Sequence, residues 1–215
     1  MDKQQQNIWF FNKWAKSYDR FIFGFWMRYV QRKCIKEIIS DINHIKNKYG
    51  KITQKIKILE VACGTGYALE YLSKTQKRKL DLYGIDLSKE MIKISKEKLG
   101  KNAQIMLGDV EKLPYKNGTF DYVFCTESFH HFPDPIRSVT EMKRILKKGG
   151  KLILSDINFI PLWLFNILFK IEPGFIHLYS KKEFKKLFEK CGLRVISQKR
   201  VFLFSIQTTA QQKRH

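Results

Sequence analysis

A glycine loop and two aspartates follow apolar, strand-like runs of the sequence. Gly64 and Gly66 come after the run Ile56–Val61, and Asp86 and Asp109 come after two further runs of this kind. The carboxyl ends of parallel strands meet at one edge of a sheet, where ligands bind, so we expect these three places to lie side by side. Together they could hold a nucleoside that carries a charged tail.

The residue types in the loop suit such a ligand. Gly64 and Gly66 let the backbone turn tightly and approach a ligand without a Cβ in the way. The helix predicted over Tyr67–Ser73 would point free N–H groups and its positive dipole end at that ligand. Asp86 stands twenty positions after Gly66, a distance at which a carboxylate can accept both hydroxyls of a ribose.

Two other interpretations compete with this one. A single aspartate after a strand is commonly a turn or helix-cap residue. A nicotinamide dehydrogenase shares the strand, the turn and the acid, but its fingerprint needs a third glycine where Leu69 stands. Asp109 would also have no role in a dehydrogenase. The ordered set of motifs therefore favours a different nucleoside cofactor.

From Ile56 to Asp156 the sequence resembles the class I S-adenosylmethionine-dependent methyltransferases. The resemblance rests on the run from Ile58 to Gly66, on Asp86 and Gly108-Asp109, on Phe120–Phe124, and on the segment that ends in Gly149-Gly150. It implies an α/β fold: a Rossmann-like, doubly wound, seven-stranded sheet that is mostly parallel and has one antiparallel strand. Two departures are Ala62, where the family has its first loop glycine, and Lys148, where it has a proline.

The resemblance also implies S-adenosyl-L-methionine as the cofactor and assigns residues to it. An acid at Asp109 meets the adenine amino group, and the N–H of Val110 reaches a ring nitrogen. The segment Ala15–Asp19 resembles an element of small-molecule methyltransferases, the menaquinone and ubiquinone group among them, in which a tyrosine closes over the cofactor; Tyr18 could instead be an amphipathic core residue. The cofactor-binding residues expected are Tyr18, Glu60, Ala62, Gly64, Gly66, Asp86, Leu87, Asp109 and Val110.

Candidate catalytic residues follow the fourth strand, in a segment that faces the transferred methyl group in related enzymes. His131 or His130 could act as a base or orient the acceptor, because imidazole titrates near neutral pH. Alternatively, the pair packs against or caps the next helix. Glu127 is a further candidate. The segment lacks the Asn/Asp-Pro-Pro-aromatic and Pro-Cys signatures of two kinds of nucleic-acid base methylation, which disfavours both.

Composition limits the other function classes. The 215 residues carry a formal net charge of +21, which suits an anionic partner. The basic residues are scattered, without an arginine-rich tract or a nucleic-acid motif, so no specific nucleic acid is expected and peripheral contact with an anionic membrane stays open. Four cysteines without paired spacing predict neither a metal site nor disulfides. The absence of a secretory signal at the N-terminus predicts a cytoplasmic protein.

The chain divides into three predicted regions. Residues 1–50 form an N-terminal helical lid, 51–207 form the methyltransferase domain, and 208–215 form a frayed tail. Within the domain, the aromatic-rich insertion 158–179 would cover the substrate together with Phe21, Phe23, Phe25 and Trp26.

This apolar surface favours a small, lipophilic acceptor such as a lipid or a quinone-like metabolite. Packing of the two aromatic segments on each other and a dimer interface are the alternatives, so a monomer and a homodimer both remain open. RNA or protein methylation and a non-catalytic, cofactor-binding role are the alternative functions.

Overall fold

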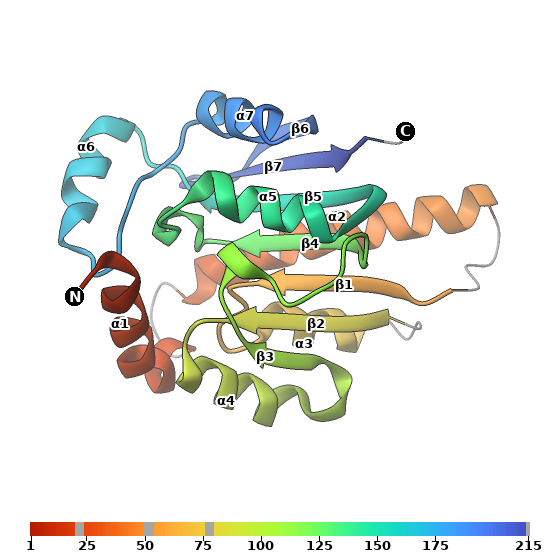
Figure 1. Cartoon of the computed structure of the whole chain (residues 1–215), viewed down its shortest axis with the longest axis horizontal. Coiled ribbons are helices and arrows are strands. Elements are labelled where there is room, and N and C mark those ends of the chain that lie inside the picture. Colours follow the sequence, from red (N-terminus) through yellow and green to blue (C-terminus); the bar gives the residue numbers. More distant parts are fainter. Residues whose placement is uncertain (20–23, 50–53, 76–79, 214–215) are drawn as a thin grey trace.

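One seven-stranded sheet forms the centre of the protein (Figure 1). The structure is a computed structural model and describes residues 1–19, 24–49, 54–75 and 80–213. The strands follow the order β3-β2-β1-β4-β5-β7-β6, and β7 runs antiparallel to both of its neighbours while the other adjacent pairs are parallel. The mostly parallel sheet with one reversed strand is thereby confirmed. The strands are β1 (Ile56–Val61), β2 (Leu80–Asp86), β3 (Gln104–Leu107), β4 (Phe120–Thr126), β5 (Leu146–Ile157), β6 (Leu193–Phe202) and β7 (Ser205–Gln212).

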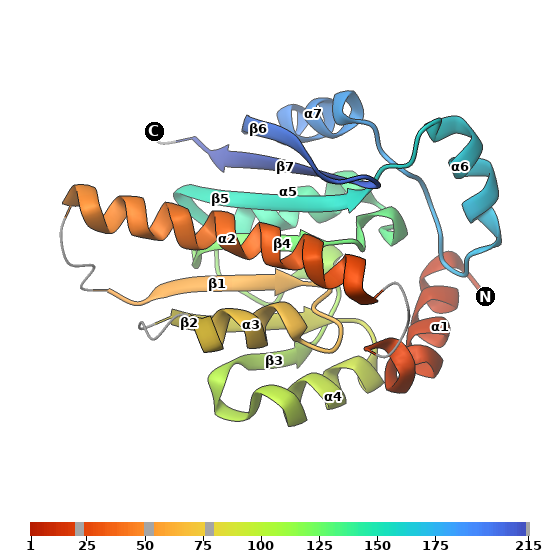
Figure 2. The same ribbon diagram turned by 180° about the vertical axis from the view of Figure 1, so that it is seen from behind.

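Helices cover both faces of the sheet. Helices α5 (Pro135–Ile145) and α7 (Lys181–Lys190) lie in front of it in Figure 1, whereas α2 (Gly24–Tyr49) and α3 (Tyr67–Thr75) lie in front of it when it is seen from behind in Figure 2. Helix α4 (Lys89–Leu99) packs beside α3. Each face has its own apolar core, so β1 and β4 are buried from both sides. This two-sided burial explains why their sequences read as continuous apolar runs.

Capping residues fix where two helices begin. The Ser88 hydroxyl accepts from the backbone N–H of Met91 and so begins α4 directly after β2. Ser180 and Glu183 form a complete capping box at the start of α7. The N-terminus of α4 therefore lies at the carboxyl edge of the sheet, where the loop and the two aspartates meet, and its Glu90 N–H donates to Asn12 Oδ1 of α1.

Two further helices lie across this carboxyl edge. Helix α1 (Lys3–Tyr18) and helix α6 (Leu162–Leu168) stand at the left of Figure 1 and at the right of Figure 2. Helix α1 is held by side chains: Ser88 Oγ donates to Asn12 Oδ1 at 2.7 Å, and Lys98 pairs with Asp19 at 2.8 Å. The predicted N-terminal helices thus exist, and α1 lies over the edge where a lid would be needed.

The C-terminal segment corrects the expectation of a frayed tail from residue 208. Strand β7 extends to Gln212 and lies between β5 and β6. Its polar residues are buried because they have partners: Thr209 Oγ1 donates to Glu37 Oε1 at 2.6 Å, and Gln207 Nε2 donates to Glu37 Oε2 at 2.6 Å. Polarity alone suggested exposure, but a buried polar strand is stable when each group is hydrogen-bonded.

Some expectations fall on residues that the structure does not describe. Phe21 and Phe23 of the predicted cover lie outside the described residues, as does the predicted domain boundary between residues 50 and 51. Within the described part of the chain, the four cysteines are free and buried. No helix there is both long enough and apolar enough to cross a bilayer.

The position of β7 generates a stability prediction. A chain that ends at Gln207 should lose about 3 kcal/mol or more of unfolding free energy, because it removes the buried Ala210, leaves Lys151–Leu154 of β5 without their partner residues and leaves Glu37 without Thr209. Urea unfolding monitored by circular dichroism would measure the loss. A chain that ends at Gln212 is the control and should unfold like the full-length protein. Equal stability of both truncated chains would contradict the position of this strand.

Candidate active site

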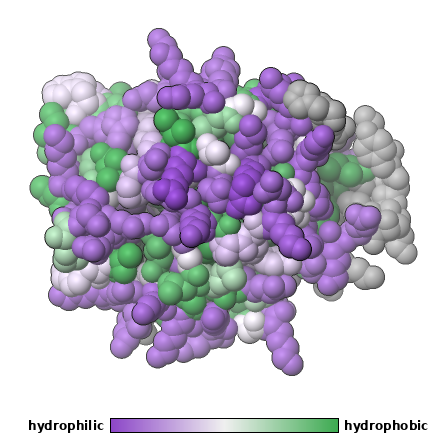
Figure 3. Space-filling model, viewed as in Figure 1, coloured by the Kyte–Doolittle hydropathy of each residue, from purple (hydrophilic) through white to green (hydrophobic). Residues whose placement is uncertain are grey.

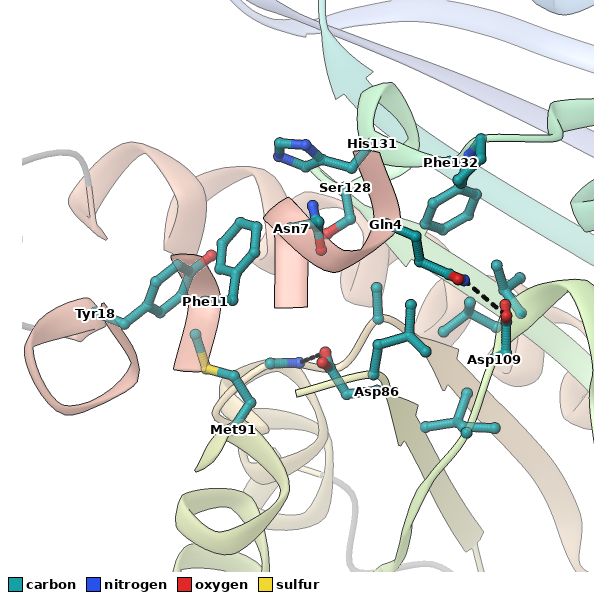
Figure 4. Close-up of a pocket in the computed structure, with 18 residues that line it drawn as sticks. Gln4, Asn7, Phe11, Tyr18, Asp86, Met91, Asp109, Ser128, His131 and Phe132 are labelled. Carbon is teal, nitrogen blue, oxygen red and sulfur yellow. Dashed lines mark hydrogen bonds between the residues drawn. The ribbon is translucent and has the colours of Figure 1, made fainter. Parts of the chain in front are cut away.

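A pocket opens at the carboxyl edge of the sheet, beneath α1 (Figure 4). Helix α1 contributes one wall, and the ends of β1, β2, β3 and β4 contribute the other. The residues of the sequence prediction that line this pocket are Tyr18, Ala62, Gly64, Asp86, Leu87, Asp109, Val110 and His131. Residues that were not predicted as site residues line it as well, among them Gln4, Asn7, Phe11, Ser128 and Phe132.

The glycine loop leaves part of this pocket free of side chains. Gly64 has φ +50°, and a Cβ built there would meet nothing within 4 Å, so the space beside its backbone is open to a ligand. Ala62 has φ +54°, a left-handed conformation that costs energy for any residue with a Cβ. The alanine therefore stands in a left-handed conformation that glycine adopts without this cost.

Gly66 lies elsewhere. A Cβ at Gly66 would be 2.8 Å from Leu99 Cδ1 and 3.0 Å from Ser95 Cβ, so its small size lets the loop pack on α4. Glu60 also stays outside the pocket lining: it is buried and, among the described residues, its Oε2 has no hydrogen-bond partner. Burial, and next the Asp86 carboxylate, raise the pKa of Glu60 well above its ordinary value.

Asp86 joins the loop to the start of α4. Its Oδ2 accepts from the backbone N–H of Gly64 and its Oδ1 from that of Ser88, each at 2.8 Å (Figure 4 draws the first). Burial raises the pKa of Asp86, although these N–H groups act in the opposite direction. Each carboxylate oxygen can accept more than one hydrogen bond, so Asp86 can still receive ligand hydroxyls.

Asp109 is bound by α1. Gln4 Nε2 donates to Asp109 Oδ2 at 2.7 Å, and the N–H of Glu111 donates to Oδ1 at 2.9 Å (Figure 4 draws the first contact). Nothing in the polar N-terminal sequence pointed to Gln4. A ligand amino group that approaches Asp109 would have to share this oxygen with Gln4 or displace it.

A second, larger pocket adjoins the first. Phe11, Tyr18 and His131 line both. Its walls are mainly apolar and come from α1, the start of α2, the end of β5, α6 and the short 3₁₀ helix η4 (Phe169–Ile171). The apolar residues are Phe11, Trp14, Trp26, Met27, Ile157, Phe159, Phe165, Leu168, Phe169 and Ile171, and the polar ones are Tyr18, Glu127, His130, His131 and Glu172.

Two adjacent histidines in this second pocket differ in charge. His130 Nδ1 lies 2.7 Å from Asp156 Oδ1, and both side chains are buried. Burial lowers the pKa of His130, but the Asp156 carboxylate outweighs it and raises the pKa to about 8. Burial, and next the charge of His130, lower the pKa of His131 well below its ordinary value. At neutral pH an imidazolium therefore stands beside a neutral imidazole.

Glu127 is a further polar group of the second pocket. It has φ +53°, unusual for a residue with a side chain, and it is buried. Burial, and next the charge of Asp156, raise the pKa of Glu127 to about 8, while Ser155 Oγ and Ser205 Oγ donate to its carboxylate at 3.1 and 3.2 Å. Such a carboxyl group is mostly protonated at pH 7.

Asp156 and Glu172 were not among the predicted site residues. Asp156 stands near the carboxyl end of β5, at the same edge as Asp86 and Asp109, so strand position could have found it. Glu172 lies in the insertion, with Oε1 3.6 Å from His131 Nε2, and only tertiary structure brings it there. The two predicted histidines and Glu127 do lie together in one pocket.

Comparison with known proteins gives consistent matches. A family model described as "Methyltransferase domain" matches residues 59–154. A demethylmenaquinone methyltransferase of Staphylococcus aureus is 30% identical over 180 residues, which cover 82% of this chain and 70% of the relative.

Solved structures share the fold. A methyltransferase from Haloferax volcanii, solved with the Trm112 methyltransferase activator, superposes with a TM-score of 0.77 at 17% identity, covering 95% of this chain and 98% of that one. A SAM-dependent methyltransferase from Aquifex aeolicus superposes with a TM-score of 0.64 at 23% identity, covering 82% of this chain and 88% of that one.

The raised pKa of Glu127 predicts a pH-dependent stability. Between its ordinary value of 4.5 and about 8 the native state binds more protons at this site than the unfolded state, so stability falls as pH rises through that window. Glu127→Gln removes this site. The unfolding free energy of the variant minus that of the wild type should therefore rise by on the order of 3 kcal/mol from pH 5 to pH 9.

Urea unfolding at pH 5, 6.5, 8 and 9 would test this. Glu189→Gln, at an exposed carboxylate of α7, is the control and should follow the wild-type curve. If the Glu127→Gln curve ran parallel to the wild-type curve, the carboxyl group would not be held protonated by the fold.

Proposed function

The chain belongs to the S-adenosylmethionine-dependent methyltransferases, and we propose that it methylates a small, lipophilic, quinol-like acceptor. The observation that carries this proposal is the second pocket, whose walls are apolar and whose titratable side chains gather where it adjoins the first pocket. Apolar walls with a few convergent polar groups are typical of sites for lipophilic small molecules.

The residues of the first pocket fit the cofactor of the family. S-adenosyl-L-methionine supplies an activated methyl group on a positively charged sulfur. We propose that Asp86 accepts the ribose hydroxyls, that Asp109 and the N–H of Val110 take the adenine, and that the open backbone at Gly64 admits the methionine end. The space beside Gly64 and the position of Asp86 and Asp109 on one pocket wall support this assignment. Ala62 and Leu87 complete this wall, and Tyr18 lies opposite on α1.

The residues where the two pockets meet could remove the hydroxyl proton of the acceptor. His131 lines both pockets and is neutral, so it has a free nitrogen that can accept the proton of an acceptor hydroxyl. Its lowered pKa makes it a weak base, and the acceptor anion formed beside it would stabilise the imidazolium. The His130 ring, whose charge Asp156 partly offsets, lies beside His131, and protonated Glu127 can donate a hydrogen bond to an acceptor oxygen. The shared wall of the two pockets supplies the alignment that methyl transfer requires.

The identity of the acceptor draws on both the relatives and the pocket. Curated relatives at about 28–30% identity are demethylmenaquinone methyltransferases, which act on a quinone-type molecule by name. The apolar lining from α6 and η4 suits such a molecule better than a nucleic acid, whose phosphates would be poorly solvated there. The net positive charge by itself does not favour RNA as the acceptor.

A direct assay tests the proposed function. The protein would be incubated with S-adenosylmethionine and one acceptor at a time, either a demethylated quinol, a water-soluble phenol or RNA. The demethylated cofactor product would then be quantified in each reaction. Turnover should be greatest with the quinols. Turnover with RNA alone, or cofactor binding without turnover on any acceptor, would overturn the proposal in favour of the alternative functions.

Asp86→Ala should weaken cofactor binding by about 1–3 kcal/mol, since it removes charge-assisted hydrogen bonds to the ribose and the anchor of the Gly64 loop. Isothermal titration with S-adenosylmethionine measures the change, and circular dichroism checks the fold. Asp81→Ala, on the same strand but paired with Lys55 at its other end, is the control and should bind normally. Unchanged affinity in a folded Asp86 variant would show that the cofactor binds elsewhere.

His131→Ala should reduce kcat by about 10²–10⁴-fold, the usual contribution of a general base. The dissociation constant of S-adenosylmethionine should change only slightly, because the ribose and adenine contacts are intact. His177→Ala, at a half-exposed histidine paired with Glu183, is the matched control. A loss of cofactor affinity that accounts for the whole loss of activity would assign His131 to cofactor binding instead.

A further inference from the structure

Large apolar side chains are exposed at the carboxyl edge of the sheet, around α6. The exposed fractions are 67% for Trp163, 75% for Ile160, 91% for Ile171 and 71% for Leu203, which lies in the turn between β6 and β7. Figures 1 and 2 place α6 at the periphery, beside the ends of β5 and β7. In Figure 3, green and pale atoms border the left edge, where α6 lies in Figure 1. We call these four residues, with Ile167 and Leu168, the α6 face.

The α6 face is continuous with the acceptor pocket. Leu168 and Ile171 line that pocket and are nevertheless 51% and 91% exposed, so they stand at its mouth. On the inner side, Phe159 stacks on Phe165 at 4.5 Å between ring centroids, and both line the pocket. One segment thus forms the wall of the pocket with its inner side chains and an apolar surface with its outer ones.

Cationic side chains accompany this apolar surface. Lys170 is exposed within η4, and Arg200 donates to the carbonyl of Leu203 at 2.8 Å, at the base of the β6–β7 turn. On α1, Lys13 Nζ lies 5.1 Å from the ring centroid of the exposed Trp9. Glu172, next to Ile171, turns toward His131 instead of outward. A membrane-binding surface combines these same features, in that apolar and tryptophan side chains enter the interface and cations meet anionic headgroups.

We propose that the α6 face binds an anionic lipid bilayer and that the acceptor enters its pocket directly from the bilayer. The second half of this statement rests on the proposed function, whereas the first does not. A second copy of the chain is the less suitable occupant, because each copy has a net charge of +21 and two like faces would bring their cations together. Phosphatidylglycerol headgroups would instead neutralise them.

Vesicle sedimentation tests the binding surface. The wild type should bind vesicles of phosphatidylcholine with 30 mol% phosphatidylglycerol, and binding should weaken with added salt and with pure phosphatidylcholine. The double variant Trp163→Ser/Leu203→Ser should bind the anionic vesicles about tenfold or more weakly. The matched control is Ile45→Ser/Met106→Ser, which removes two exposed apolar side chains away from the α6 face and should bind like the wild type.

Activity measurements separate this proposal from the proposed function. Trp163 and Leu203 do not line the acceptor pocket, so the double variant should methylate a water-soluble short-chain quinol at the wild-type rate and lose activity only with vesicle-embedded quinol. Vesicle binding that is absent, or equal in both variants, would overturn the membrane surface even if the soluble quinol is methylated. Vesicle binding without any quinol turnover would preserve the surface and overturn the proposed function. A wild-type dimer that the double variant disrupts in analytical ultracentrifugation would show that a second copy covers the face.

Discussion

The hydrogen bonds that Asp86 accepts from two backbone N–H groups determine the geometry of the first pocket. Gly64 belongs to the loop after β1 and Ser88 begins α4, so a single carboxylate fixes two segments that are distant in sequence. The left-handed backbone at Ala62 and Gly64 is held in place by this contact and by the packing of Gly66 on α4. A strained loop persists only where its surroundings determine it, and here they do. The pocket is therefore largely formed before a ligand binds.

Helix α1 is bound over this preformed edge by polar side chains and by apolar packing. Gln4 binds Asp109, Asn12 accepts from the capping residue Ser88, and Asp19 pairs with Lys98 and accepts from Thr65. The Gln4–Asp109 contact belongs to the pocket lining, whereas the contacts of Asn12 and Asp19 bind α1 to α4 and to the loop after β1. Polar contacts of this kind contribute about 1 kcal/mol each, and α1 packs through apolar side chains as well, because Ala15 is buried and the Phe11 ring lies 5.3 Å from the His131 ring. The position of α1 over the pocket suits a lid, because its closure removes water from the site.

The sequence predicted the site residues that directly follow a strand, and it did not predict those that only tertiary contacts bring to the site. Asp86, Asp109 and the Gly64 loop meet because parallel strands end at one edge of the sheet, and apolar runs in the sequence show where each strand ends. Gln4 and Glu172 reach the site from segments that carry no periodic signal, so nothing local could identify them. The prediction of a frayed tail from residue 208 was wrong for a related reason. Thr209 and Gln207 of β7 are buried because Glu37, on a helix distant in sequence, accepts their hydrogen bonds. Burial of a polar residue depends on its partner, and one sequence does not show partners.

Around the second pocket, ionisable side chains are buried and large apolar side chains are exposed, the opposite of the usual arrangement in a protein. Ionisable groups such as Glu127, His130 and Asp156 are buried, while Trp163 and Ile171 face outward. Desolvation makes the buried groups costly unless they share protons and hydrogen bonds, and the raised pKa of Glu127 together with the His130–Asp156 pair limits that cost. Exposing the outward apolar side chains to water costs free energy, and a lipid interface would remove this cost. Both features fit the proposed acceptor. A lipophilic molecule that reacts through an ionisable hydroxyl would need a pocket with an apolar entrance and polar groups at its inner end. The proposed acceptor and the proposed bilayer surface would together account for ionisable groups inside this edge and apolar groups on its outside.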